Sequence, residues 1–338
     1  MTDAATVIPE TEMGTPIFKP DALNLVASVP CPIKVKFKMV LEAFIDQYNA
    51  SHDTPIYCPS IMDGIPHGLE ETLRSVDDPQ YLPDLWLSTS MRTALTQPFR
   101  KNFIDSGVLQ GINSDLSEFP QPFKDAGEKY NLGFFAFGNW SLLCDLSVKD
   151  AAPYPRTWDD LLQEQYHGQI AIHGCHGEVG AMTLLQVLLE KYSDEGIRKL
   201  AHNIGGVRHF SKLIKAVDSN DKERVAYNIL PNAAINQLPS RKRAAIVELE
   251  DGPLLTPMTL FAKKSKLAEL QPIIEFLKGP KAAQVFHVGG FIEPAMMDWA
   301  EPFTFPSWES LLNNDHAKMT EHLNNTFIDA LAPGLMTV

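Results

Sequence analysis

Short apolar runs alternate with longer amphipathic segments along the first quarter of the chain. The runs at 23–29, 54–57 and 83–87 have the length and apolar content of strands. The segments at 33–48 and 68–76 carry apolar residues at the spacing of one helical face. Strands that alternate with helices predict an α/β fold built on a parallel sheet.

The helix expected over 33–48 has more apolar positions than a narrow stripe requires. A broad apolar face is predicted for it, made of Val35, Phe37, Met39, Val40, Leu41, Phe44 and Ile45. Lys34 and Lys38 share another face, because residues four apart are neighbours on a helix. That face is either solvated or, through Lys34, turned to an anion at the helix start.

The loops that leave the predicted strands carry most of the polar and thiol chemistry of this region. They cover 28–32, 58–66 and 88–93, and ligands of parallel α/β sheets bind beyond the carboxyl ends of the strands. Hydroxyl, amide and guanidinium donors suit a carboxylate, a phosphate or another oxyanion. The alternative for the hydroxyl groups is ordinary turn and N-cap chemistry. The candidate ligand-binding residues in these loops are Ser28, Cys31, Cys58, Ser88, Thr89, Ser90 and Arg92.

A second region with a distinctive pattern begins near the middle of the chain. Thr157 and Asp160 have capping-box spacing and predict a short helix, which Gly168 would terminate. A short strand is expected over 169–172, followed by a loop with three glycines and a long apolar helix from about 181 to 192. Glycines allow close backbone approach, and a helix N-terminus directs amide donors at a ligand. The pattern therefore predicts a ligand-binding loop.

Several segments together resemble a family of known proteins. They are Pro155–Leu162, Tyr166–Ile172, Ala226–Pro231, Val247–Pro253, Phe276–Pro280 and Gly290–Pro294. In this order they are similar to segments of the two-lobed solute-binding proteins of ABC importers, which have the type II periplasmic-binding fold. The similarity is greatest to the ferric-iron and polyamine-like branch. The resemblance implies a two-lobed α/β protein with a central ligand cleft and two hinge crossovers.

The resemblance also implies a domain organisation. Residues 1–20 are expected to form an N-terminal arm. Lobe 1 would comprise 21–136 and 254–338, with the C-terminal helices included. Lobe 2 would comprise 137–253.

Further candidate binding residues follow from the resemblance. They are Asn139 and Trp140 on the first crossover, His173, Cys175, His176 and Gly177 in the glycine-containing loop, Tyr227 on a strand of lobe 2, and Asp251 on the second crossover. Trp140 could instead pack at the hinge, Tyr227 could pack or line the rim of the cleft, and Asp251 could begin the turn that follows it. Ferric-iron-binding members of the family usually use paired tyrosines, and the sequence has no adjacent tyrosine pair.

Four of these residues form a candidate metal site. Cys31, Cys58, Cys175 and His176 would face the cleft on the expected fold, and thiolate with imidazole suits a soft or borderline metal ion. The alternative is that the cysteines are small buried apolar groups and that His176 is solvated. A bound metal ion is the one cofactor that the sequence suggests.

The overall charge and the N-terminal sequence narrow the function classes. The 338 residues carry a formal net charge of −13, which disfavours nucleic acid and anionic membranes as partners. No apolar run approaches the about 20 residues of a transmembrane helix. The first ten residues lack the basic and apolar regions of a signal peptide. We expect a cytoplasmic protein if the chain is full length, and a periplasmic or extracellular one if a signal peptide was removed.

The predicted function is capture of a small anionic or metal-containing solute by hinge closure between the lobes. The expected protein partner is an ABC permease or a cytoplasmic protein that receives the ligand. The alternative is a cytoplasmic enzyme on the same scaffold, of the kind that acts in menaquinone or thiamine-precursor biosynthesis. Such an enzyme would use His173, Cys175 and His176. No nucleophile elbow, P-loop or dinucleotide fingerprint supports catalysis.

Overall fold

The computed structural model of the chain describes residues 18–59, 69–148, 150–175, 177–217, 219, 224–238 and 242–336. The chain forms two compact units. Unit 1 comprises Met1–Phe137 and Pro257–Met297, and unit 2 comprises Gly138–Thr256 and Asp298–Val338. The chain passes from unit 1 to unit 2 within strand β5 (Phe134–Asp145) and returns within strand β11 (Leu254–Lys263).

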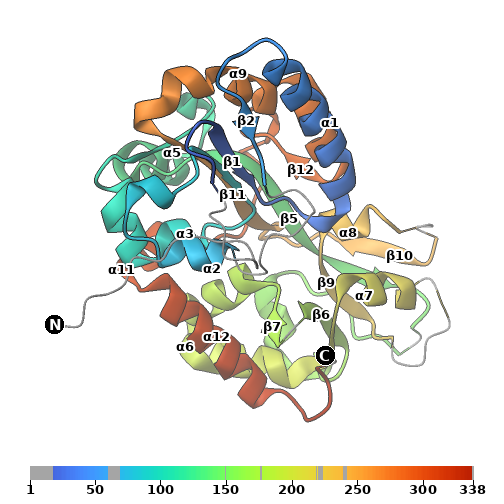
Figure 1. Cartoon of the computed structure of the whole chain (residues 1–338). Helices are drawn as coiled ribbons and strands as arrows, with labels where there is room; N and C mark the ends of the chain where they lie inside the picture. The colour runs from blue at the N-terminus through green and yellow to red at the C-terminus, as the bar shows by residue number, and fades with distance from the viewer. Residues whose placement is uncertain are drawn as a thin grey trace. The chain divides into compact units, whose positions relative to one another are not determined.

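Unit 1 follows the predicted alternation of strands and helices (Figure 1). Besides its parts of β5 and β11, its elements are β1 (Leu23–Ala27), α1 (Cys31–Asn49), β2 (Ile56–Tyr57), α2 (Leu69–Arg74), η1 (Pro79–Tyr81), β3 (Leu85–Ser88), α3 (Arg92–Leu95), α4 (Gln97–Phe99), η2 (Arg100–Ile104), β4 (Leu109–Gly111), η3 (Leu116–Glu118), α5 (Gln121–Tyr130), η6 (Lys264–Lys266), α9 (Leu267–Lys278), α10 (Pro280–Val288), β12 (Phe291–Ile292) and η7 (Pro294–Met296).

The sheet of unit 1 is parallel where the sequence predicts it to be. β1 pairs in parallel with β2 through Leu23 and Ile56, and with β3 through Leu25 and Leu85. All five residues of β1 are buried, because β1 lies between two strands and its side chains pack on both faces of the sheet. The α/β fold class is confirmed.

Helix α1 is present as predicted, but its buried face differs from the predicted one. Val35 and Met39 are 60% and 65% exposed, whereas Phe37 and Leu41 are completely buried. α9 lies beside α1 (Figure 1), where Phe44 stacks on Phe276 with ring centroids 4.2 Å apart. With apolar residues on most sides of the helix, sequence spacing alone does not identify the face that packs on the sheet.

Unit 2 is a second α/β unit. Besides its parts of β5 and β11, its elements are η4 (Trp158–Leu162), η5 (Glu164–Tyr166), β6 (Ile170–Cys175), β7 (Glu178–Val179), α6 (Met182–Asn203), β8 (Ile204–Arg208), α7 (Phe210–Val217), β9 (Tyr227–Pro231), α8 (Asn232–Ile235), β10 (Ala244–Val247), α11 (Trp308–Asn313) and α12 (His316–Ala330). β6 lies between β8 and β9 and is parallel to both, and β9 pairs antiparallel with β5.

The predicted start of the middle region is confirmed in detail. Thr157 and Asp160 form a reciprocal capping box at the start of η4. Gly168 has a positive φ of 68° and precedes β6, so it makes the turn between helix and strand. The following helix, α6, is longer than predicted and contains a kink at Ser193.

The C-terminal helices belong to a different unit from the one expected. Residues 254–338 were expected to lie entirely in lobe 1, whereas 298–338 lies in unit 2. The cause is packing, because α12 runs along α6 (Figure 1) and its Met319 and Leu323 are buried. The expected boundaries near 136 and 253 remain a prediction.

Candidate ligand-binding site

The strand exits of unit 1 meet at one edge of its sheet. β1, β2 and β3 are parallel, so the residues after them, Ser28, Cys58 and Thr89, all follow carboxyl ends at the same edge. Ser28 is fixed there, because its backbone N–H donates to the carbonyl of Leu87 at 2.8 Å. The observed register therefore brings the starts of these three loops to one edge, while residues 60–66 of the second loop lie outside the described part of the chain.

Helix α1 starts at this same edge. Its N-cap residue is Pro30, no side chain caps it, and its first turn contains no acidic residue. The half-buried Lys34 stands in that turn instead. A cation at a helix N-terminus opposes the helix dipole, so this sequence favours an anion near the start of α1.

The hydroxyl groups after β3 serve mainly to build the turn. Ser88 is completely buried; its hydroxyl donates to the carbonyl of Ser90 at 2.9 Å and accepts from the backbone N–H of Ser90 at 3.1 Å. The hydroxyl of Ser90 accepts from the backbone N–H of Arg92 at 3.0 Å. Direct ligand contact through Ser88 is therefore a wrong prediction, because its side chain has no exposed surface. Thr89 and Arg92 are half-buried and remain candidates.

Unit 2 brings a second set of polar residues to one edge of its sheet. β6, β8 and β9 are parallel, so His173 near the end of β6, Arg208 at the end of β8 and Asn232 after β9 share an edge. β5 runs antiparallel to β9, and its Trp140 pairs with Pro231. Asn139 and Trp140 therefore lie at this same edge, where the family resemblance expected binding residues.

His173 is held in one orientation by its neighbours. Its ring stacks on Trp140 with centroids 6.0 Å apart. Nδ1 lies 3.1 Å from the backbone N–H of Phe210, from which it accepts in one neutral tautomer, and 3.3 Å from the carbonyl of Arg208, to which it donates in the other. Burial lowers the pKa of His173, and the nearby His209 lowers it further, against a raising effect from the Arg208 carbonyl. A lowered pKa favours the neutral ring at neutral pH, and a neutral imidazole has one N–H donor and one acceptor nitrogen.

Lowered basicity of His173 predicts a pH-dependent stability. The pKa of histidine in the unfolded chain is about 6.5. The contribution of His173 to the free energy of unfolding is therefore complete above that pH. It is lost as the pH falls towards the lower pKa of the folded state, by at most about 1.4 kcal/mol per pH unit. In the variant His173→Asn, an amide oxygen replaces Nδ1 as acceptor and nothing titrates. We expect urea midpoints at pH 7.5, 6.5 and 5.5 to fall less steeply for the variant. If the urea midpoints of the wild type and the variant fell equally with pH, the lowered pKa of His173 would be contradicted.

Two buried amide oxygens near Trp140 lack a donor. Oδ1 of Asn139 and Oδ1 of Asn232 have no hydrogen-bond partner among the described residues. A buried acceptor without a donor costs free energy, so such atoms in a binding protein are natural partners for ligand hydroxyl or amine groups. Asn139 was predicted as a binding residue; Asn232 was not.

Asn232, Arg208 and His209 are the residues that the sequence analysis missed. Arg208 ends β8 and His209 follows it, and the Ile-Gly-Gly-Val-Arg sequence of β8 has two glycines and no strand-like alternation. The available signal was the position of these residues between two apolar helices, at a place where a βαβ unit needs a strand.

Tyr227 is not available to a ligand, contrary to the prediction. It is completely buried on β9, and its hydroxyl donates to the carbonyl of Ala152. Burial raises the pKa of this phenol far above its usual value. A tyrosinate ligand to iron is disfavoured at this position, because the hydroxyl is buried and already bonded to the Ala152 carbonyl.

Asp251 has a structural role, and its predicted role in binding stays a prediction. Its carboxylate accepts from the backbone N–H of Trp158 at 3.1 Å, and the Trp158 indole N–H donates to the carbonyl of Gly252 at 2.8 Å. Burial raises the pKa of Asp251, while the Trp158 N–H bond lowers it. These contacts attach the chain at 250–252 to the start of η4, so the carboxylate is already engaged.

The thiol and glycine predictions have different outcomes. Cys58 is half-buried, while the side chains of Cys31 and Cys175 and the whole of His176 lie outside the described part of the chain. The metal set of Cys31, Cys58, Cys175 and His176 therefore stays a prediction. Gly177 has a positive φ of 78°, and its carbonyl accepts from Asn324 of α12 at 2.9 Å.

Comparison with known proteins agrees with this architecture. A family model described as bacterial extracellular solute-binding protein matches residues 80–314, which is more than half of the chain. The chain belongs to this family. Search of curated proteins found no match. No helix in the described residues is long and apolar enough to cross a membrane.

Solved structures similar to this solute-binding protein share its fold at low sequence identity. Apo ferric ion-binding protein A of Pasteurella haemolytica is 14% identical with a TM-score of 0.61, over 92% of this chain and 98% of that chain. Iron-bound HitA of Pseudomonas aeruginosa is 15% identical with a TM-score of 0.61, over 91% and 99%. The spermidine/putrescine ABC transporter substrate-binding protein PotD of Streptococcus pneumoniae is 14% identical with a TM-score of 0.54, over 91% and 98%.

These findings confirm the predicted family resemblance. The fold is that of the two-lobed periplasmic binding proteins, and the function of the family is to bind a solute. Family membership supports solute binding and gives no support to the alternative of a biosynthetic enzyme. The family is described as extracellular, which corresponds to the second of the two locations considered above.

Proposed function

We propose that this protein captures a small anionic solute between its two units by hinge closure, and that an arginine from each unit grips the anion. The observation that supports this most directly is that Arg92 and Arg208 each stand at the carboxyl end of a parallel strand of their own unit. Arg92 follows parallel strand β3 in unit 1, and Arg208 ends parallel strand β8 in unit 2. Guanidinium groups bind carboxylates and phosphates in a bidentate manner, which gives both affinity and orientation.

The neighbours of each arginine fit the same class of ligand. In unit 1 the start of α1 provides a favourable potential for an anion, with Lys34 in its first turn. In unit 2, neutral His173 would offer an Nε2–H donor in the tautomer whose Nδ1 accepts from Phe210. The unpaired amide oxygens of Asn139 and Asn232 would accept from hydroxyl or amine groups of the same solute. We therefore propose a hydroxy- or amino-substituted carboxylate or phosphate.

Other ligand classes receive less support from these residues. The described residues assigned above to the two strand edges include no carboxylate, which disfavours a spermidine- or putrescine-like cation. A ferric ion held by tyrosinates is disfavoured by the burial of Tyr227. A metal ion that arrives as a complex with a carboxylate remains compatible, because the anionic part would meet the same arginines.

The test is a binding experiment on two arginine variants. Native mass spectrometry of the purified protein, followed by a thermal-shift screen of small carboxylates and phosphates, would first identify a ligand. Truncation of a charged partner in a desolvated pair weakens binding by about 30-fold or more, so Arg92→Ala and Arg208→Ala are each expected to raise the Kd by that factor in calorimetry. The Kd of Arg92→Lys should lie between those of the wild type and Arg92→Ala, because lysine keeps the charge and loses the bidentate geometry.

Arg198→Ala is the matched control. Arg198 is exposed on α6, where its guanidinium pairs with Asp194 at 3.3 Å, so its loss should leave the Kd unchanged. The proposal fails if Arg92→Ala and Arg208→Ala fold normally and bind the identified solute as tightly as the wild type. Hinge closure is tested separately by solution scattering, where addition of solute should reduce the radius of gyration.

We propose that the protein delivers its solute to an ABC permease, which is the partner that the family context favours. An extracytoplasmic location is proposed on the same ground. A pull-down of the permease that depends on bound solute would support this step.

A further inference from the structure

Three side chains with metal-binding atoms converge on the surface of unit 2, away from the strand edge described above. Glu164, His167 and His202 each offer one ligand atom, and these atoms lie within 4.8 Å of one another. All three residues are exposed, so an ion can reach them from solvent. Nε2 of His202 lies 3.8 Å from Oε1 of Glu164.

Two of the three ligands come from one tight turn. Glu164 and His167 are three residues apart across the 3₁₀-helix η5, and the backbone N–H of His167 donates to the carbonyl of Glu164 at 3.0 Å. Side chains three apart on a 3₁₀-helix are eclipsed, so both project to the same side. Between them, Tyr166 is buried and its hydroxyl donates to the carbonyl of Pro153 at 2.9 Å, which anchors the turn.

The third ligand is placed by the end of α6. Next to His202, the buried Asn203 donates through Nδ2 to the carbonyls of Leu161 and Gln163, at 2.8 and 2.9 Å. These bonds attach the last turn of α6 directly to the segment before Glu164. The two backbones that carry the ligands are thus fixed to one another without any ion.

The sheet adds a second constraint on the same geometry. His167 is followed by Gly168 and β6, while His202 is followed by β8, and β6 and β8 are parallel neighbours. A Cβ at Gly205 would overlap the carbonyl of Gly168, which shows how closely these two chain segments approach. Ligands that are held in place before the ion arrives cost less entropy on binding.

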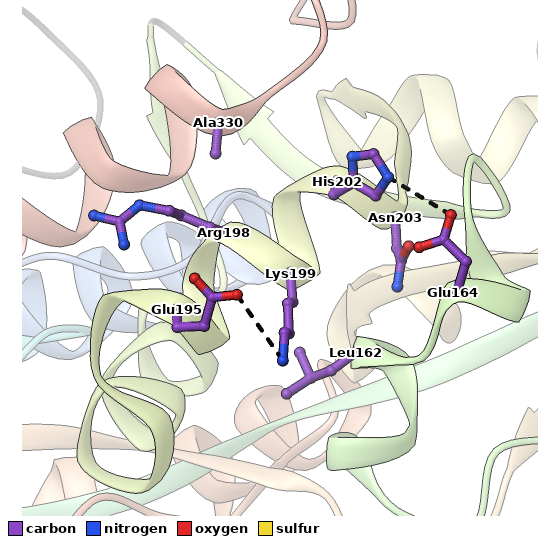
Figure 2. Close-up of a pocket in the computed structure, with 8 residues that line it drawn as sticks. All are labelled: Leu162, Glu164, Glu195, Arg198, Lys199, His202, Asn203 and Ala330. Atoms are coloured by element: carbon purple, nitrogen blue, oxygen red, sulfur yellow. Dashed lines mark ion pairs between the residues drawn. The ribbon is translucent and has the colours of Figure 1, made fainter.

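An open pocket of about 520 Å³ lies beside these residues (Figure 2). Figure 2 shows Glu164 and His202 pointing towards one another at one side, with Lys199 near Leu162 at the other. Lys199 pairs with Glu195 at 3.9 Å, so part of its charge is balanced by that carboxylate.

We propose that Glu164, His167 and His202 form a binding site for a divalent transition metal ion, with Zn²⁺ as the best fit. Two imidazoles and a carboxylate are a common zinc ligand set, with Zn–N and Zn–O bonds of about 2.0–2.2 Å. With such bonds, two ligand atoms of a tetrahedral ion lie about 3.4 Å apart. Small rotations of the exposed side chains would bring the three ligand atoms to this separation and complete the site. Three protein ligands leave a fourth position for water or for a donor from outside. The ion would join η5 to the end of α6.

The site is tested by calorimetric titration of the apo protein with Zn²⁺. We expect the double variant His167→Ala/His202→Ala to bind one equivalent fewer than the wild type. Glu164→Gln alone should lower the affinity for that Zn²⁺ ion by at least about tenfold, because a neutral amide is a poorer zinc ligand than a carboxylate. Even residues that only support the ligands of a metal site change its metal affinity by about 10- to 100-fold. A Zn²⁺-dependent rise in melting temperature should disappear in the double variant.

His322→Ala is the control, because His322 is also exposed, lies in the same unit and contacts a carboxylate, Asp194, at 2.8 Å. It should keep the full number of equivalents. The proposal is overturned if the double variant, shown by circular dichroism to be folded in EDTA, binds as many equivalents with the same affinities as the wild type. Ions held by the cysteines would be retained in the double variant and so do not confuse the result.

Discussion

Replacement of Gly252 by alanine is expected to destabilise unit 2 by about 4 kcal/mol or more, a severe effect for a single methyl group. Gly252 has a positive φ of 70°, and an added Cβ would overlap the carbonyl carbon and oxygen of Pro302. The atoms in the way belong to the backbone, so no side chain can rotate to make room. The expected measurement is a large fall in the urea midpoint, or loss of soluble protein.

The region around Gly252 explains why relaxation there is difficult. The Thr304 N–H donates to the carbonyl of Pro253, and the Leu255 N–H donates to the carbonyl of Thr304, at 2.9 and 3.0 Å. The Thr304 hydroxyl also donates to the Asp251 carbonyl at 2.8 Å. A shift of 302–304 to accommodate a methyl group would therefore break several hydrogen bonds at once.

Gly168→Ala separates the two causes of the Gly252 effect. Gly168 has nearly the same φ of 68°, but an added Cβ there would meet nothing within 4 Å. Gly168→Ala should therefore lower the free energy of unfolding by only about 1–2 kcal/mol, which is the cost of a left-handed conformation for alanine. Equal losses of stability in the two variants would show that strain in φ dominates and that the overlap with Pro302 is relieved easily.

The local order of elements was predictable from the sequence, because local signals determine it. The capping box at Thr157 and the turn at Gly168 were identified correctly, since each depends only on residues close in sequence. The parallel register of β1, β2 and β3 follows from the alternation of strands and helices, and it places the strand exits at one edge.

The role of single polar residues was not predictable, because it depends on contacts distant in sequence. Asp251 caps η4 more than ninety positions earlier, and Tyr227 reaches the carbonyl of Ala152. Nothing near either residue in the sequence distinguishes these roles from ligand binding. The same limit applies to Asn232, whose unpaired amide oxygen becomes apparent only when β9 is placed beside β5.

The second large effect is expected for Asp84→Ala, which should lower the free energy of unfolding by about 3–5 kcal/mol. Asp84 is 4% exposed and precedes β3. One carboxylate oxygen accepts from the backbone N–H of Asn24 at 2.8 Å, and the other pairs with Lys263 at 3.0 Å. Loss of the carboxylate leaves the Asn24 N–H without this partner and the largely buried Lys263 ammonium group without its counter-charge.

A second substitution tests that explanation. In Asp84→Ala/Lys263→Met the ammonium group is replaced by an apolar chain of similar length, so part of the lost stability should return. Urea unfolding of the wild type, both single variants and the double variant gives the coupling between the two residues. If the double variant is less stable than Asp84→Ala, the penalty does not come from an uncompensated charge.

Binding should respond differently from stability in these variants. Asp84 lies at the amino end of β3, whereas the proposed anion contact Arg92 follows its carboxyl end. Ligands of parallel sheets bind at carboxyl ends, so the Kd for solute should be unchanged at temperatures where Asp84→Ala is folded. A Kd that rises with the loss of Asp84, in protein shown to be fully folded, would mean that the two ends of β3 are coupled and that the site is not confined to the strand exits.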